Sequence, residues 1–138
     1  MTSNIQFDTI ILLDDNDTSI FLNSDVVSDY FPDAQIITYS NSSLFVKDAL
    51  KNLQWFREPT LLLLDINMPN FMGYEVLDEL EDELEDLAHM VVLMVTSSNL
   101  KRDIERSTRF SSIIGYIEKP LSAEKFEHVF NHSIDRSL

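Results

Sequence analysis

The segment Leu61-Leu62-Leu63-Leu64-Asp65-Ile66-Asn67-Met68-Pro69 decides the fold of this 138-residue chain. Four consecutive leucines, preceded by Pro59-Thr60, predict a short strand that is buried on both faces. Such a strand belongs in the middle of a parallel sheet, where helices cover both sides. Asp65 follows at the carboxyl end of the strand, the edge at which open parallel sheets bind ligands. We expect this carboxylate to be paired, coordinated or reactive, because burying it alone is costly.

The rest of the chain alternates between short apolar runs and segments with helical spacing. Strands are predicted at residues 10–13, 36–39, 61–64, 90–95 and 113–117. Helices are predicted at 17–31, 41–53, 77–87 (after a loop that holds Gly73), 100–109 and 121–134. Five strands alternating with five helices predict right-handed crossovers and a doubly wound parallel α/β sheet. Residues 36–39 are the least continuously apolar strand and should lie at an edge. This gives the flavodoxin-like order 2-1-3-4-5, with the topological switch point between strands one and three.

Composition limits the class of protein and its partners. The length and the 44% of hydrophobic residues predict one globular domain over 1–138, with a core of about 8–135. The chain has no cysteine, which excludes a disulfide framework and a thiolate metal site. A net charge of −14 disfavours nucleic acid and anionic membranes, and favours divalent cations and basic protein surfaces. No signal peptide is visible, and the longest apolar run, 90–95, is too short to span a bilayer, so we expect a cytoplasmic protein.

Four predicted strand ends bring polar residues to one edge of the sheet. They are Asp14-Asp15, Asp65, Thr96-Ser97 and Glu118-Lys119-Pro120. Three neighbouring carboxylates repel one another unless a cation lies among them, and carboxylate oxygens with room for water suit Mg²⁺. A carboxylate nucleophile facing a hydroxyl, an ammonium and a metal ion is an arrangement suited to phosphoryl transfer.

Most of these residues, together with five others, resemble a known family. The set consists of Asp14-Asp15, Asp65 before Met68-Pro69, Gly73, Thr96, and Gly115-Tyr116 before Lys119-Pro120. In this order it resembles the response-regulator receiver domains of two-component signalling, over residues 8 to 135. The loop at 110–114 departs from the family because it lacks the frequent Gly-Ala turn.

The resemblance implies a phosphoacceptor and a magnesium site. Asp65 would accept a phosphoryl group from a histidine kinase or a histidine phosphotransfer protein in a phosphorelay. Asp15 would bind Mg²⁺ directly, Asp14 through water, and Asp65 and the backbone carbonyl of Asn67 would complete the protein ligands.

The resemblance also implies a switch. Lys119, preceding Pro120 in a cis peptide bond, would pair with Asp65 or its phosphate. Thr96 would move toward the phosphoryl oxygen, and Tyr116 would turn inward. Ser98 lies at the position that would tune the phosphate lifetime.

The segments 100–109, 113–117 and 121–134 form the expected output face for an unidentified downstream protein. Four of the ten basic residues lie on the first of these segments: Lys101, Arg102, Arg106 and Arg109. Because nothing follows Leu138, the chain resembles a stand-alone receiver without an output domain, and we expect a monomer or a weak dimer.

Alternatives remain open from the sequence. The segment Asp15-Asn16-Asp17-Thr18 matches the Asp-x-Asp-x-Thr motif of haloacid-dehalogenase-like phosphatases, in which Asp15 would be the nucleophile. Against it, no strand ending in two acids follows Lys119. A receiver-like interaction module that works without phosphorylation is the other alternative. Taken alone, Thr96-Ser97 would more simply cap the next helix, and Tyr116 would pack at an edge strand.

Overall fold

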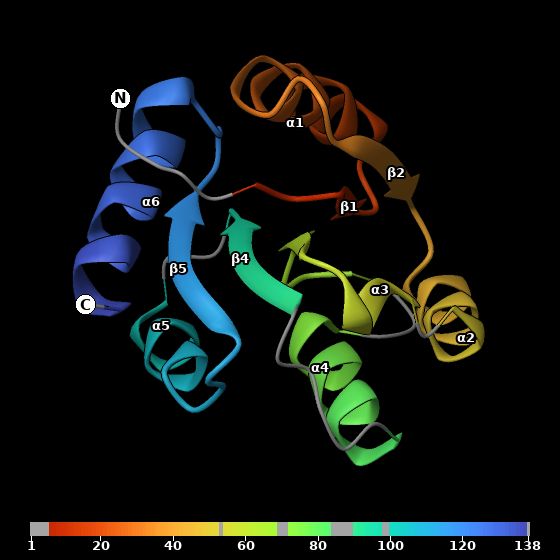
Figure 1. Ribbon diagram of the computed structural model, residues 1–138. Coiled ribbons are helices and arrows are strands. Elements are labelled where there is room, and N and C mark those ends of the chain that lie inside the picture. Colours follow the sequence, from red (N-terminus) through yellow and green to blue (C-terminus); the bar gives the residue numbers. More distant parts are fainter. Residues whose placement is uncertain (1–5, 53, 69–71, 84–89, 98–99, 138) are drawn as a thin grey trace.

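The chain folds into a five-stranded parallel sheet between two layers of helices. The computed structural model describes residues 6–52, 54–68, 72–83, 90–97 and 100–137 (Figure 1). The strands are β1 (Thr9–Leu13), β2 (Gln35–Tyr39), β3 (Thr60–Leu64), β4 (Met90–Thr96) and β5 (Ile113–Glu118). Their order is β2-β1-β3-β4-β5, and all neighbours pair in parallel. The predicted flavodoxin-like fold and strand order are confirmed.

Within the described residues, six helices connect and cover the strands. They are α1 (Asp17–Tyr30), α2 (Ser42–Lys51), α3 (Gln54–Arg57), α4 (Gly73–Glu83), α5 (Lys101–Ser107) and α6 (Ala123–Ser137). Helices α1 and α6 cover one face of the sheet, and α2, α3 and α4 cover the other (Figure 1). The described part of the chain contains no helix that is both long and apolar enough to cross a membrane.

The central strand serves both hydrophobic cores at once. Leu62 and Leu64 pack with α2 and α4, whereas Leu61 and Leu63 pack with α1 and α6. All five residues of β1 and β3 are buried, as their unbroken apolar sequence predicts.

The register of the sheet sets the positions of the strand ends. Leu13 of β1 lies opposite Leu64 of β3, so the residues that follow them leave the sheet at the same level. The Asp65 N–H donates to the carbonyl oxygen of Leu13 at 3.1 Å, which continues the ladder by one step. Two acidic residues are thereby placed side by side.

Asparagine side chains cap two of the helices. Asn16 caps α1 and Asn41 caps α2, each accepting a hydrogen bond from a backbone N–H three residues later at 2.9 Å. The alternative reading of Thr96-Ser97 as the cap of the next helix does not hold, because Leu100 occupies the N-cap position of α5.

Some helix boundaries differ from the prediction. Helix α3 was not predicted, because a single turn is too short to show periodicity. Gly73 was expected in a loop but is the first residue of α4. Helix α2 ends at Lys51, α5 ends at Ser107 and α6 begins at Ala123, all within the predicted ranges. The predictions at Pro69, residues 84–87 and Ser98 fall outside the described residues.

Candidate functional site

Three carboxylates meet where β1 and β3 end. Asp14 and Asp15 follow β1, and Asp65 follows β3. One carboxylate oxygen from each lies within 4.8 Å of the others. Asp14 is 3% exposed and Asp65 is 4% exposed, whereas Asp15 faces solvent. The predicted acidic cluster is therefore present, with two buried members and one accessible member.

Lys119 places a positive charge between the two buried carboxylates. Its Nζ lies 2.7 Å from Asp14 Oδ2 and 3.2 Å from Asp65 Oδ2. Its backbone N–H donates to the carbonyl oxygen of Thr96 at 2.8 Å, and its peptide bond to Pro120 is cis, as expected. The sequence suggested a pair with Asp65 alone, but the shorter contact is to Asp14.

Burial and pairing shift the protonation of this cluster. Burial raises the pKa of the Asp14 carboxyl above its usual value, although the contact with the Lys119 ammonium and the hydrogen bond from the Asn16 N–H oppose this shift. Burial alone would lower the pKa of the Lys119 ammonium, but its contacts with Asp14 and Asp65 outweigh burial and raise it. Lys119 is thus held in its charged form by the two carboxylates.

The cluster fits a hard divalent cation. One ammonium faces three carboxylates, so negative charge remains in excess. Asp14 Oδ1 accepts the Asn16 N–H at 2.9 Å, and Asp65 Oδ1 accepts the Asn67 N–H at 3.2 Å. Asp14 Oδ2 is at ion-pair distance from Lys119 but receives no well-directed hydrogen bond from the described residues. A buried oxygen of this kind, next to the accessible Asp15, matches the oxygen ligands that Mg²⁺ prefers.

Gly73 lets helix α4 begin against the backbone of Asp65. A Cβ atom at this position would overlap the carbonyl oxygen of Asp65 and lie 2.9 Å from the Cα of Ile66. The Gly73 N–H donates to the Ile66 carbonyl oxygen at 2.8 Å. Gly73 was predicted as a loop residue, and neither this contact nor the burial of the neighbouring Tyr74 was predicted.

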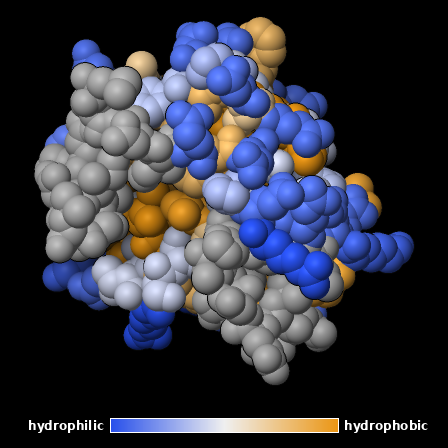
Figure 2. Space-filling model, in the orientation of Figure 1, coloured by the Kyte–Doolittle hydropathy of each residue, from blue (hydrophilic) through white to orange (hydrophobic). Residues whose placement is uncertain are grey.

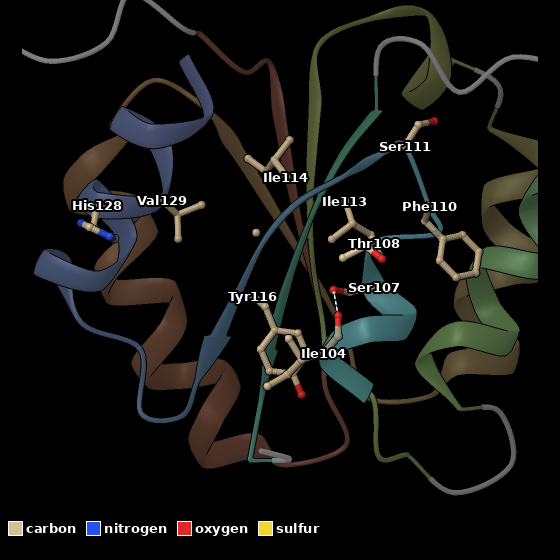
Figure 3. Close-up of a pocket in the computed structure, with 11 residues that line it drawn as sticks. Ile104, Ser107, Thr108, Phe110, Ser111, Ile113, Ile114, Tyr116, His128 and Val129 are labelled. Atoms are coloured by element: carbon tan, nitrogen blue, oxygen red, sulfur yellow. Dashed lines mark hydrogen bonds between the residues drawn. The ribbon is translucent and has the colours of Figure 1, made fainter. Parts of the chain in front are cut away.

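The two expected switch residues lie in different surroundings. Thr96 is fully buried at the end of β4, where its carbonyl oxygen accepts the Lys119 N–H. Tyr116 is half-buried on β5 and lines a cavity of about 540 Å³ between α5, β5 and α6 (Figure 3). Ile104 and Ser107 of α5 and Val129 of α6 line the same cavity.

Comparison with known proteins decides the family. Residues 10–131 match the family model of the response regulator receiver domain. The chain belongs to the response-regulator receiver family. The family expected from the sequence is thereby confirmed. The match of residues 15–18 to the motif of haloacid-dehalogenase-like phosphatases does not reflect the family of this chain.

Similar proteins agree with this assignment. The receiver domain is 30% identical over 120 residues to the polar-differentiation response regulator DivK of Brucella ovis, covering 86% of this chain and 89% of that protein. A two-component response regulator from Cytophaga hutchinsonii has the same fold, with a TM-score of 0.81 and 23% identity over 95% of this chain and 99% of that one. A response regulator receiver protein from Dyadobacter fermentans gives a TM-score of 0.75 at 20% identity, covering 91% and 97%. At these identities the two structures support the fold alone.

Proposed function

We propose that this receiver domain is a phosphoacceptor, in which Asp65 takes a phosphoryl group from a phosphohistidine of a histidine kinase or histidine phosphotransfer protein. The observation that carries the proposal is the placement of Asp65. Its carboxylate is buried at the end of the central strand, 3.2 Å from the Lys119 ammonium and within the acidic cluster. Asp15 is the less suitable nucleophile, since it is exposed and Lys119 is paired with the other two carboxylates.

The proposed step exchanges one bond to phosphorus for another. A carboxylate oxygen of Asp65 attacks the phosphorus atom, forming a P–O bond while the P–N bond of the donor breaks. The electron pair of the broken bond stays on the imidazole nitrogen. A donor ring protonated at its other nitrogen leaves as neutral imidazole, and an unprotonated ring takes a proton from water. Lys119 balances charge on the phosphoryl oxygens, and Thr96 offers its hydroxyl as a hydrogen-bond donor.

The acidic cluster would hold the cation that this chemistry needs. We assign Asp15 as a direct ligand of Mg²⁺, Asp14 as a ligand through water, and Asp65 and the Asn67 carbonyl as the others. When bound, Mg²⁺ would supply positive charge to the phosphoryl oxygens. The chain's own contribution is to hold two carboxylates in place through Lys119 and backbone N–H groups.

We assign the output to the face formed by α5, β5 and α6. Tyr116 and Ile104 line the cavity there, so a rearrangement of Thr96 and Tyr116 would change the shape of this surface. Figure 2 shows a largely hydrophilic surface with apolar side chains visible in a recess over the sheet. Lys101, Arg102 and Arg109 are exposed near this face and would favour a partner with acidic groups.

Intact mass after incubation with acetyl phosphate tests the proposal. The wild type should gain one phosphoryl group in Mg²⁺ and almost none in EDTA, and Asp65→Asn should gain none. Asp33→Asn, a change at an exposed acid outside the cluster, is the matched control and should behave like the wild type.

Two other outcomes would replace the proposal. Phosphorylation that survives in Asp65→Asn and disappears in Asp15→Asn would make Asp15 the nucleophile. A wild type that neither gains the group nor binds Mg²⁺ would instead indicate an interaction module that works without phosphorylation.

A further inference from the structure

Helix α5 is short and exposes most of its side chains. It contains seven residues. Lys101, Arg102 and Glu105 are exposed, and Ile104 is 42% exposed. A helix this short is not stable by itself in water, so its position must depend on contacts with neighbouring elements.

Tyr74 of helix α4 makes the most direct of these contacts. Its side chain is 2% exposed, and its hydroxyl donates a hydrogen bond to the backbone carbonyl oxygen of Asp103 in α5. Its ring stacks on Phe110, which follows α5, with ring centres 5.7 Å apart and planes at 11°. One buried side chain therefore contacts both the helix and the turn after it.

Arg106 adds a second connection between α4 and α5 on the outside of the first. Its guanidinium lies 4.7 Å from the centre of the Tyr74 ring and 3.6 Å from a carboxylate oxygen of Asp78. The Asp78 pair is about half exposed and contributes little by itself. Arg106 of α5 thus lies over the ring of the same tyrosine that bonds to Asp103.

The other end of this connection is the backbone of Asp65. Tyr74 directly follows Gly73, which is in close contact with the Asp65 carbonyl and hydrogen-bonded to Ile66. Close-packed groups transmit displacements because they leave no space to absorb them. A shift of the Asp65–Ile66 backbone must therefore move Gly73, and Tyr74 moves with it.

The phenol of Tyr74 stays a hydrogen-bond donor under all ordinary conditions. Burial raises the pKa of Tyr74 to about 12, and the neighbouring Tyr116 and Asp103 add to the shift. Tyr116 is thus an electrostatic neighbour of Tyr74.

We infer that Tyr74 is a positioning residue that ties helix α5 to the end of strand β3, so that a change at Asp65 reaches α5 through Gly73 and Tyr74. This route runs through the backbone of Gly73 and so differs in its first step from the one through Thr96, although Tyr116 interacts with Tyr74. It rests on the proposed function only for the nature of the change at Asp65. The contact itself belongs to the unmodified protein.

Hydrogen exchange measured by mass spectrometry on the peptide covering residues 100–110 tests the inference. Tyr74→Phe keeps the ring and removes only the hydroxyl. In the unmodified protein it should speed the exchange of α5 by about tenfold, the size expected for one lost hydrogen bond. Arg106→Gln, a change at a half-exposed side chain, should have a smaller effect in the same direction.

Tyr39→Phe is the matched control. The Tyr39 hydroxyl also donates one hydrogen bond, to Asp48 Oδ2 at 2.8 Å, and burial likewise raises its pKa to about 12. Its partner lies on α2, so its loss should leave α5 unchanged. Equal exchange of α5 in the wild type, Tyr74→Phe and Tyr39→Phe would overturn the inference.

The same peptide, measured after acetyl phosphate and Mg²⁺, tests the coupling. The three proteins are compared at the same extent of phosphorylation, measured by intact mass. Phosphorylation should change the exchange rate of α5 at least threefold less in Tyr74→Phe than in the wild type and in Tyr39→Phe. An undiminished change in Tyr74→Phe would refute the coupling role. If the wild type takes up no phosphoryl group, the proposed function and the coupling fail together, while exchange in the unmodified variants still decides whether Tyr74 holds α5.

Discussion

Replacing Lys119 by Met should expose how much of the site's stability depends on one charge. The Lys119 ammonium lies between two carboxylates with side chains 5% exposed, at 2.7 and 3.2 Å. Without it, Asp14 and Asp65 face each other with oxygens no more than 4.8 Å apart. Two unit charges at that distance repel by about 3.5 kcal/mol at an effective dielectric constant of about 20.

The expected loss follows from this repulsion and from the burial of the acids. Removing one partner of a buried ion pair costs about 3 to 5 kcal/mol. Lys119 keeps 19% of its side chain exposed, and Asp14 can take up a proton, so we expect the lower end, about 3 kcal/mol. The measurement is the free energy of unfolding in urea at pH 7, with EDTA present. Lys47→Met, a change at an exposed lysine of α2, should stay within about 0.5 kcal/mol of the wild type.

Magnesium distinguishes this explanation from a loss of packing. Removing the ammonium strengthens the negative potential of the cluster, so Mg²⁺ should stabilise Lys119→Met more than it stabilises the wild type. A loss below about 1 kcal/mol in EDTA would show that the pair is not the main compensation for the buried acids. Equal stabilisation of both proteins by Mg²⁺ would refute the electrostatic reasoning.

Three more changes test separate parts of the structure. Without Mg²⁺, Asp14→Asn should become more stable relative to the wild type as the pH rises above 3.8. The reason is that the pKa of Asp14 is raised in the folded protein, so the charged carboxylate destabilises the wild type. Urea unfolding of both proteins at pH 4 to 7 measures this difference. Lys119 has a raised pKa, so its contribution to stability is complete below pH 10.5 and falls above it. Urea unfolding of the wild type and Lys119→Met on both sides of pH 10.5 will show this. Gly73→Ala should destabilise by about 1 to 3 kcal/mol in thermal unfolding, although alanine normally favours a helix. Asn16→Ala should cost about 1 kcal/mol in urea unfolding through the lost cap of α1.

The strands and their order could be predicted because burial on both faces leaves a direct sequence signal. Unbroken apolar runs mark β1, β3 and β4, and the mixed residues of β2 place it at an edge. Since parallel neighbours share a register, the sequence also predicts that Asp14 and Asp65 lie side by side.

The remaining features depend on distances that a sequence does not contain. Gly73 suggests a loop by propensity, yet it begins a helix because only a residue without Cβ fits against the Asp65 carbonyl. The preference of Lys119 for Asp14 over Asp65 depends on side-chain placement of half an ångström. Tyr74 carries no motif, and its contact with Asp103 appears only once α4 and α5 are placed together.

The charge of the site links its stability to its proposed chemistry. Phosphorylation of Asp65 would replace a carboxylate of charge −1 by a phosphoryl group of charge near −2, while Lys119 still supplies only one positive charge. The excess of negative charge that limits the stability of the unmodified protein would therefore grow during the reaction. The same cation would have to neutralise both the original excess and the charge added by the phosphoryl group. The Mg²⁺ dissociation constant obtained from the concentration dependence of this stabilisation should then match the Mg²⁺ concentration that half-saturates the rate of phosphorylation. If the rate is half-saturated at an Mg²⁺ concentration far from this dissociation constant, the cation acts on the phosphoryl donor rather than on the Asp14, Asp15 and Asp65 cluster.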